Sequence, residues 1–275
     1  MKLPLPTLQA RSCAGLSFLT DEALFGACGV RMGFTRRGGG ASLPPYDSLN
    51  LGSHVGDDLE AVRENRRRLL DAAGLGGTRL LMANQVHGSS VLSVDDGFDE
   101  KLDRVAAQAG AGADGLAVSV PGVTALLCFA DCVPVVVVSA SGAFAVAHAG
   151  WRGAFADIPR KAVEALRVLD TDRGGDGSPF RYNAYIGPHI MAECYQCDPD
   201  LVSQFVERFG PECAWDGDHL SLDAAVRASL LGAGVAAERI VSAGVCTACS
   251  TEDYYSYRAS GGVCGRHGAF AGRKE

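Results

Sequence analysis

Two apolar runs of strand length, separated by a turn rich in serine and glycine, dominate the hydrophobic pattern of the chain. Both lie within Phe129–Gly153 and predict a buried β-hairpin. Cys132 enters the first strand and His148 leaves the second. Because hairpin strands are antiparallel, the start of the first lies beside the end of the second. A loop centred on Ala140 would place the two residues directly opposite each other, and a turn centred slightly later would offset them.

Elsewhere, helical and strand-like patterns alternate. Apolar residues recur every three or four positions in four predicted helices, Leu59–Leu75, Arg160–Leu169, Pro199–Phe209 and Leu222–Leu231. Short apolar runs between turn residues predict strands at Val30–Phe34, Arg79–Met82, Ser90–Val94, Leu116–Ser119, Val123–Phe129, Tyr182–Ile186 and Ile240–Ala243. Gln108–Asp114 is interpreted as a linker of small residues, and residues 1–28 as a partly irregular leader. We therefore expect residues 1–275 to form one α/β sandwich domain with a mixed sheet and a central hairpin.

One end of the predicted hairpin is unusually polar. Asp131, Cys132, His148, Trp151 and Arg152 gather there, although a hairpin buried in a core needs no polar cluster. Cysteine and histidine are the preferred ligands of zinc and of other borderline metals. The pattern therefore predicts a metal site at this end of the hairpin.

Composition narrows the possible partners. Hydrophobic residues make up 47% of the chain and charged residues 21%, which suits a globular core. The net charge of −7 argues against binding nucleic acid or anionic membranes through bulk charge. No segment has the pattern of a signal peptide or of a membrane-spanning helix. The ten cysteines are irregularly spaced. We therefore expect reduced thiols and a cytoplasmic protein.

Ordered motifs along nearly the whole chain resemble the laccase-domain family, also called the multicopper polyphenol oxidase or purine nucleoside phosphorylase family. The motifs that carry the resemblance are Ser48–Gly52, Asn84–Gly88, Ala113–Gly115, Ala130–Pro134, His148–Gly153, Ile186–Pro188, Cys246-Thr247 and Tyr255–Arg258. Two positions depart from the family pattern. His189 stands where cysteine is usual, and Ala259 stands where a second arginine is common.

The resemblance implies a third metal ligand, His87, beside Cys132 and His148. Three protein ligands with a free fourth position are typical of catalytic zinc, and we expect one zinc ion per chain. Copper is the less favoured metal, because its His₂Cys sites usually add an axial methionine. None of the four methionines stands at an obvious axial position, and the six histidines include no His-x-His pair.

The resemblance also implies a substrate class. Related proteins cleave adenosine, inosine, guanosine and methylthioadenosine with phosphate, and deaminate adenosine with water. The catalytic candidates are Asp131, Arg152 and Cys132, and the substrate-binding candidates are Arg36, Asn50, Gln85 and Arg258. Arg152 is expected near the metal and suits phosphate. Gln85, Asp131 or a backbone carbonyl would orient the histidine ligands.

Other functions remain open from the sequence. The same zinc site would suit an amidase that edits peptidoglycan precursors, and copper would suit a polyphenol oxidase. A non-enzymatic protein stabilised by zinc is a further alternative, in which His189 fills the fourth ligand position. We expect purine nucleosides and phosphate as partners, no nucleic acid, no membrane, and a monomer or weak homodimer.

Two cysteine pairs, Cys194-x-x-Cys197 and Cys246-x-x-Cys249, have the spacing of a metal or redox pair. The segment between them is far longer than in a zinc ribbon. We therefore interpret all four as buried or free thiols near the site.

Overall fold

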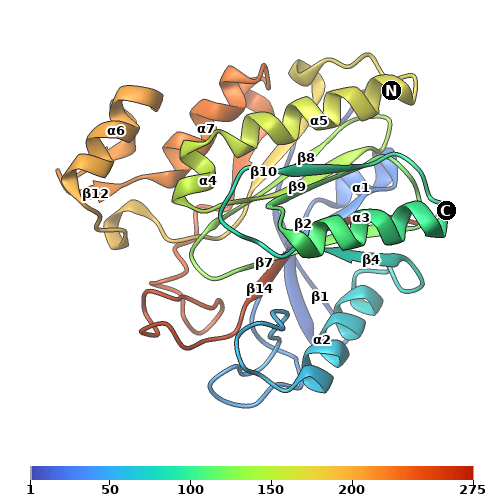
Figure 1. The fold of residues 1–275 in the computed structure, drawn as a ribbon, viewed down its shortest axis with the longest axis horizontal. Helices are drawn as coiled ribbons and strands as arrows, with labels where there is room; N and C mark the ends of the chain where they lie inside the picture. The colour runs from blue at the N-terminus through green and yellow to red at the C-terminus, as the bar shows by residue number, and fades with distance from the viewer. Residues whose placement is uncertain (1, 275) are drawn as a thin grey trace.

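Two six-stranded β-sheets face each other in the computed structural model, which describes residues 2–274 (Figure 1). The first sheet contains, in spatial order, β1 (Gln9–Cys13), β2 (Leu16–Thr20), β3 (Arg31–Thr35), β14 (His267–Arg273), β7 (Val123–Phe129) and β4 (Arg79–Met82). The second contains β13 (Ile240–Ser242), β10 (Asn183–Ile186), β8 (Val133–Val138), β9 (Phe144–Ala149), β6 (Gly115–Val118) and β5 (Val91–Val94). Both sheets are mixed, because each combines antiparallel ladders with parallel pairs such as β4–β7 and β5–β6.

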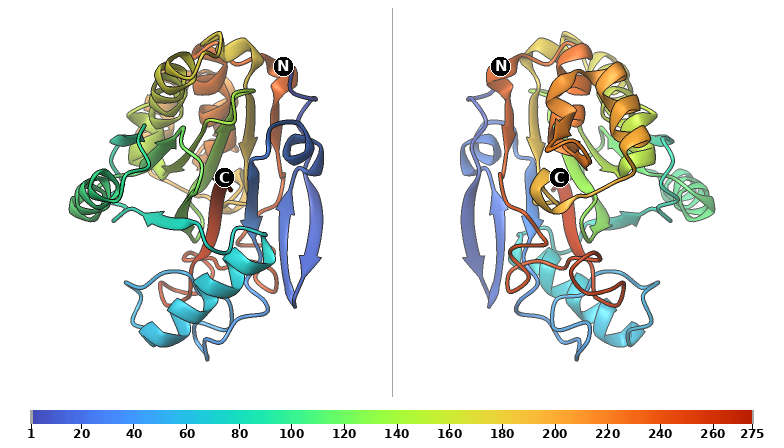
Figure 2. Two further views of the ribbon diagram at one scale, coloured as in Figure 1. Left: turned by 90° about the vertical axis from the view of Figure 1, so that its right-hand side faces the viewer. Right: turned by 90° about the vertical axis from the view of Figure 1, so that its left-hand side faces the viewer.

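Helices surround the two sheets, on their outer faces and along their edges (Figure 2). They are α1 (Glu22–Cys28), α2 (Leu59–Ala72), α3 (Asp99–Ala111), α4 (Trp151–Phe155), α5 (Ile158–Asp172), α6 (Pro199–Phe209) and α7 (Leu222–Gly232). One apolar core lies between the sheets, a second packs α4, α5, α6 and α7 against the β8–β9 side, and a third packs α2 against the first sheet. A small ribbon of β11 (Ala214–Trp215) and β12 (His219–Leu220) adjoins α6.

The position of strand β8 between two apolar cores explains why its sequence is apolar throughout. Val133, Val135 and Val137 belong to the core under the helices, while Val136 and Val138 belong to the core between the sheets. A strand covered on both faces needs apolar residues at every position rather than at alternate ones. The structure confirms the α/β fold class, with two mixed sheets where one was expected.

The central hairpin is confirmed, and its register lies between the two that were considered. Pro134 pairs with His148, and Val133 pairs with Ala149. The turn is therefore centred on Ser141, and Cys132 is offset from the position opposite His148 by two residues (134 − 132). Residues two apart on a strand point to the same side, so the thiol and the imidazole still face each other.

Three segments need comment against the sequence predictions, and for one of them the prediction was wrong. Most of the segment interpreted as a linker of small residues, residues 108–114, is helical, because residues 108–111 form the last turn of α3. In the leader, residues 2–8 are irregular, and β1, β2 and α1 follow, with Asp21 as the cap of α1. Strand β14 was not predicted, although it lies between β3 and β7 near the middle of the first sheet.

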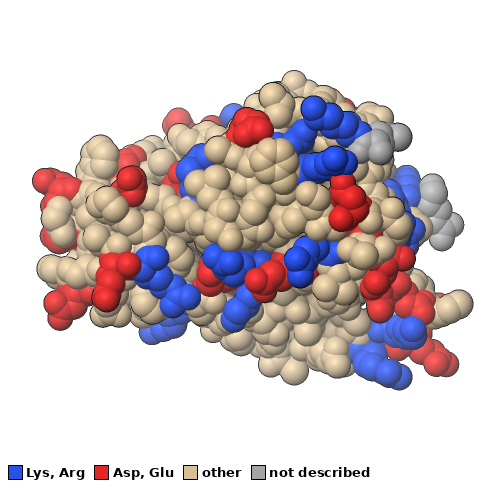
Figure 3. Space-filling model, turned by 90° about the horizontal axis from the view of Figure 1, so that it is seen from above, with Lys and Arg blue, Asp and Glu red and all other residues tan. Residues whose placement is uncertain are grey.

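Within residues 2–274, no helix is both long enough and apolar enough to cross a membrane. On the face shown in Figure 3, lysine and arginine side chains are interspersed with aspartate and glutamate rather than gathered into a broad basic patch. This face therefore offers no extended surface for a polyanion.

Candidate active site and metal centre

His87, Cys132 and His148 meet at one end of the hairpin. One ligand atom from each lies within 4.8 Å of the others, and the Cys132 Sγ is 3.9 Å from the His87 Nε2. The two imidazole rings stand edge to face, with centroids 4.8 Å apart. His148 is buried, Cys132 is half-buried and His87 is exposed, so the group opens to solvent on one side. The donor atoms and their spacing fit one small, thiophilic metal ion.

The backbone around the group is locally constrained. Cys132 directly precedes β8 and His148 lies in β9, so the hairpin register fixes both. His87 comes from the turn between β4 and β5 and has a left-handed φ of 58°, and Asp131 has a φ of 87°. Residues other than glycine rarely adopt a left-handed backbone conformation, because each one that does costs on the order of 1–3 kcal/mol. Such conformations persist only where neighbouring contacts hold them.

Asp114 supplies those contacts for the His87 turn. Its carboxylate is fully buried and accepts hydrogen bonds from the backbone amides of His87 (2.9 Å) and Gly88 (2.7 Å). It also lies 2.8 Å from the Nδ1 of His148, which leaves the Nε2 of that ring free for a ligand. A carboxylate behind a histidine in this way fixes the orientation of a metal-ligating ring.

The charges of the group favour a thiolate. Burial opposes ionisation of the Cys132 thiol, but the adjacent His148 and His87 imidazoles outweigh it and lower the pKa of Cys132. Burial would lower the pKa of His148, but Cys132 and Asp114 raise it. For Asp114, the hydrogen bonds from His148 and Gly88 overcome burial and hold its pKa below the usual range. The thiolate is the form of cysteine that binds metals.

Space for the group depends on Gly150. A Cβ atom at this position would lie 2.8 Å from the Cδ2 of His87 and 3.2 Å from the Sγ of Cys132. The backbone of Gly150 has a φ of −66°, which any residue can adopt. Glycine is therefore needed here for space rather than for backbone freedom.

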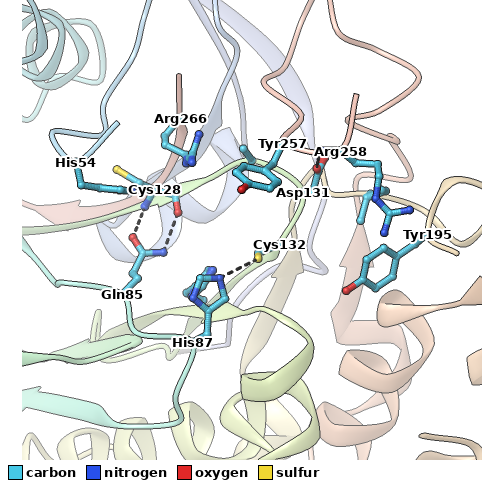
Figure 4. Close-up of a pocket in the computed structure, with 13 residues that line it drawn as sticks. His54, Gln85, His87, Cys128, Asp131, Cys132, Tyr195, Tyr257, Arg258 and Arg266 are labelled. Atoms are coloured by element: carbon cyan, nitrogen blue, oxygen red, sulfur yellow. Dashed lines mark hydrogen bonds between the residues drawn. The ribbon is translucent and has the colours of Figure 1, made fainter. Parts of the chain in front are cut away.

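The group lies on the wall of a pocket of about 530 Å³ (Figure 4). The pocket is lined by His54, Gln85, His87, Cys128, Ala130, Asp131, Cys132, His148, Ile190, Tyr195, Tyr257, Arg258 and Arg266. Figure 4 shows His54 and Arg266 at one end, and Tyr195 and Arg258 at the other. The lining combines aromatic rings, cations and hydrogen-bonding groups, which suits a polar ligand with a flat ring.

The structure brings three further candidates into this pocket. Gln85 is held by two hydrogen bonds with the backbone of Cys128, of 2.7 and 2.8 Å, so it does not orient a histidine. Asp131 accepts hydrogen bonds from the Thr247 hydroxyl and from the backbone amide of Arg258, both 2.7 Å. The Arg258 guanidinium lies over the Tyr195 ring, 5.3 Å from its centroid. Gln85 or Asp131 was expected to orient a histidine ligand. In the structure, Asp114 holds the His148 ring instead.

Two candidates lie outside the pocket. Asn50 is fully buried, and its amide bonds to Gly52, to the Asp57 carboxylate and to the backbone amide of Arg266, so it supports the Arg266 segment rather than reaching a ligand. Arg36 forms an ion pair with Asp253 at 2.8 Å. Neither residue lines the pocket.

Arg152 lines a smaller, adjacent pocket of about 170 Å³ that shares His87, Asp131, Cys132 and Tyr195 with the large one. Its guanidinium lies over the Trp151 ring, 4.4 Å from the centroid. His189 points elsewhere: its Nδ1 lies 2.8 Å from the Gly187 carbonyl, and it is not part of the His–Cys–His group. The fourth ligand position is therefore not filled by His189.

Sequence reasoning missed His54 and Tyr195 as pocket residues, whereas Arg266, in the Gly265-Arg266 motif, was among the arginines considered for an anion pocket. Burial, reinforced by Arg266, lowers the pKa of His54, which favours its neutral form. For His54, the only signal in the sequence was its position just after the Ser48–Gly52 motif.

Comparisons with known proteins place the chain in a family. The family described as Multi-copper polyphenol oxidoreductase laccase matches residues 31–274. The chain belongs to this family. Solved structures similar to this chain include YlmD from Geobacillus stearothermophilus, with a TM-score of 0.83 at 32% identity over 100% of both chains. The hypothetical protein YfiH from Bacillus licheniformis has a TM-score of 0.82 at 28% identity, over 96% of this chain and 99% of that chain.

Curated relatives within the family carry an enzyme name. The protein named Purine nucleoside phosphorylase YlmD, from Geobacillus stearothermophilus, is 36% identical over 255 residues, covering 90% of this chain and 91% of that protein. A protein of Deinococcus radiodurans named Purine nucleoside phosphorylase is 36% identical over 245 residues, covering 87% of each. The family resemblance drawn from the sequence motifs is confirmed.

Proposed function

We propose that the protein is a zinc-dependent purine nucleoside phosphorylase, with the metal held by His87, Cys132 and His148. The observation that carries the proposal is the position of this group on the wall of a pocket lined by cations and aromatic rings. The names of the relatives support the same activity. We further propose adenosine, inosine, guanosine and methylthioadenosine as substrates, and a second activity that deaminates adenosine.

Zinc fits the donor set better than copper. Zinc accepts two histidines and one cysteine, whereas copper sites of this kind usually add an axial methionine, and methionine is not among the residues that line either pocket. A bound zinc ion would supply Lewis acidity and a water of lowered pKa at the open side. The chain's own part is to hold the three donors, through the hairpin register and through Asp114.

We assign the two substrates to the two pockets according to their size. We assign the nucleoside to the larger one, where the Tyr257 and Tyr195 rings offer surfaces for a purine and Arg258 offers hydrogen-bond donors. We assign phosphate to the smaller one, where the Arg152 guanidinium offers a planar fork. Because the two pockets share His87 and Cys132, the two reactants would meet beside the metal group.

Replacing Arg152 with alanine tests this division. We expect a raised phosphate KM or a loss of phosphorolysis, because losing a charge-assisted bond costs roughly 1.5–3 kcal/mol, about ten- to over a hundred-fold. Deamination of adenosine uses water and should be affected less. The ratio of the two rates in one variant is the measurement, and Arg36→Ala is the comparison, since Arg36 lies outside both pockets. Equal losses of both activities in Arg152→Ala would show that Arg152 does not act by binding phosphate.

Replacing Gly150 with alanine tests the metal centre by crowding alone. The added methyl would press on the His87 ring, so we expect zinc affinity to fall by about tenfold or more while the fold persists. Gly26→Ala is the matched control, because a Cβ atom there meets no atom within 4 Å. Competition titration with a zinc chelator gives the affinities. An unchanged affinity in Gly150→Ala would show that the three side chains are not the ligands.

A further inference from the structure

A second group of metal-binding side chains lies away from the His–Cys–His group. Cys194, Cys246 and Cys249 bring their sulfur atoms within 4.8 Å of one another, and the Sγ atoms of Cys194 and Cys249 are 3.3 Å apart. Cys194 ends a short 3₁₀ helix, Ala192–Cys194, and the other two follow β13. The fold thus brings together three of the four thiols of two cysteine pairs that lie far apart in the sequence. Cys197 is not part of the group.

We propose that these three thiols form a second metal site, which binds a thiophilic divalent ion such as Zn²⁺ through three thiolates. Zinc–sulfur bonds are about 2.3 Å long, so two sulfurs on one ion lie at most about 4.6 Å apart. The observed spacing needs only small adjustments to reach this arrangement. Each thiol releases its proton to solvent as the ion binds, and the fourth position faces solvent.

The surroundings of the three thiols suit an ion better than they suit simple packing. Cys246 is buried, Cys194 is half-buried and Cys249 is exposed, so the group forms a path from the surface inward. A cysteine that only fills a core is normally buried, which does not describe Cys249. The backbone amide of Met191 donates to the Cys246 sulfur at 3.4 Å. Hydrogen bonds of this kind hold a metal ligand in position without contacting the metal itself.

An ion at this site would connect two segments that support one wall of the large pocket. Cys194 adjoins Tyr195, which lines the pocket. Thr247, between the other two cysteines, donates its hydroxyl hydrogen bond to Asp131. Arg258 holds the first of these segments, because its guanidinium donates to the Cys194 carbonyl at 3.4 Å and to the Gln196 carbonyl at 3.2 Å. The second ion would therefore stiffen the wall that carries Tyr195 and Arg258.

The test uses cobalt as a spectroscopic probe in the full-length Cys132→Ser variant. This change removes the single thiol of the first site, so any sulfur-to-cobalt charge-transfer band that remains reports other cysteines. Metal-free protein is titrated with Co²⁺ under reducing, oxygen-free conditions. We expect a band that saturates at one equivalent and persists when Cys197→Ser is added. Adding Cys249→Ser or Cys194→Ser instead should weaken cobalt binding by more than about tenfold.

Thermal unfolding provides a second readout on the same proteins. Zinc should raise the Tm of Cys132→Ser and of Cys132→Ser with Cys197→Ser, but not of Cys132→Ser with Cys249→Ser, since only the native state offers the assembled site. Cys249 is exposed, so its replacement leaves the core intact. The absence of a charge-transfer band in Cys132→Ser would overturn the proposal. Equal cobalt binding by the Cys197 and Cys249 variants, or a Cys194–Cys249 disulfide in freshly purified protein that reductant does not convert to a cobalt site, would also overturn it.

Discussion

Replacing Cys132 with serine is expected to remove the metal ion of the pocket and to lower phosphorolysis by more than about 100-fold. Changes to residues that only orient a ligand typically cost 10–100-fold in metal affinity or activity, so removing the single thiolate of the group should cost at least as much. The serine hydroxyl keeps the size of the side chain but offers no soft, negatively charged donor at neutral pH. Metal analysis of the purified variant, followed by rate measurements with added zinc, checks this expectation.

Cys13→Ser is the control for Cys132→Ser, because Cys13 is another half-buried, free thiol and lies on β1, outside both pockets. It should keep the metal content and the rate of the wild type. A Cys132→Ser protein that keeps both would contradict the assignment of the metal ligands.

Asp114→Asn is expected to weaken both the metal site and the fold. The buried carboxylate faces the backbone amides of His87 and Gly88 and the Nδ1 of His148. An asparagine has the same shape, but it loses the charge and turns an NH₂ group toward donors that need an acceptor. Breaking a buried, charge-assisted network of this kind costs about 3–5 kcal/mol of unfolding free energy. Zinc affinity should fall by about 10–100-fold.

Chemical denaturation and zinc titration of Asp114→Asn provide the two measurements. Asp103→Asn is the matched control, because Asp103 forms its ion pair with Arg79 at the surface, where substitutions usually change stability by less than about 0.5 kcal/mol. If Asp114→Asn retains wild-type zinc affinity under conditions where it is folded, Asp114 does not position the site.

The parts of the fold that the sequence predicted well are those with strong apolar periodicity. Helix α6 and strands β4 and β7 have the predicted boundaries, and α2 begins at the predicted residue, after the side-chain cap of Asp58. Helix α3 was missed because its buried residues are only Leu102 and Ala109, too few for a clear stripe. Strand β14 was missed because two of its seven residues are glycines. At Gly268 a Cβ atom would lie 2.7 Å from both the Leu126 and the Leu51 side chains, so close packing dictates the residue there.

For the site as well, the sequence predicted local geometry and family motifs, but not the contacts between distant segments. The proximity of Cys132 and His148 followed from hairpin geometry, and His87 came from the family motifs. The role of Asp114 could not be predicted, because it depends on how the turn at His87 and strand β9 converge on one carboxylate. The substrate-binding expectation for Asn50 rested on a motif alone. In the structure, the Asn50 amide hydrogen-bonds to Gly52 and to the backbone amide of Arg266. Residue type identified the chemistry, but only the assembled fold shows which groups face the pocket.

The most direct measurement of the central claim is the product balance from adenosine and phosphate with purified, zinc-loaded protein. We predict that ribose 1-phosphate forms in an amount equal to free adenine plus hypoxanthine, because inosine made by deamination is cleaved as well. None of the three should form without phosphate, and Cys132→Ser should form none of them. Adenosine that remains intact in the presence of phosphate and zinc would contradict the account. So would copper-dependent oxidation of phenols by a protein that forms no adenine.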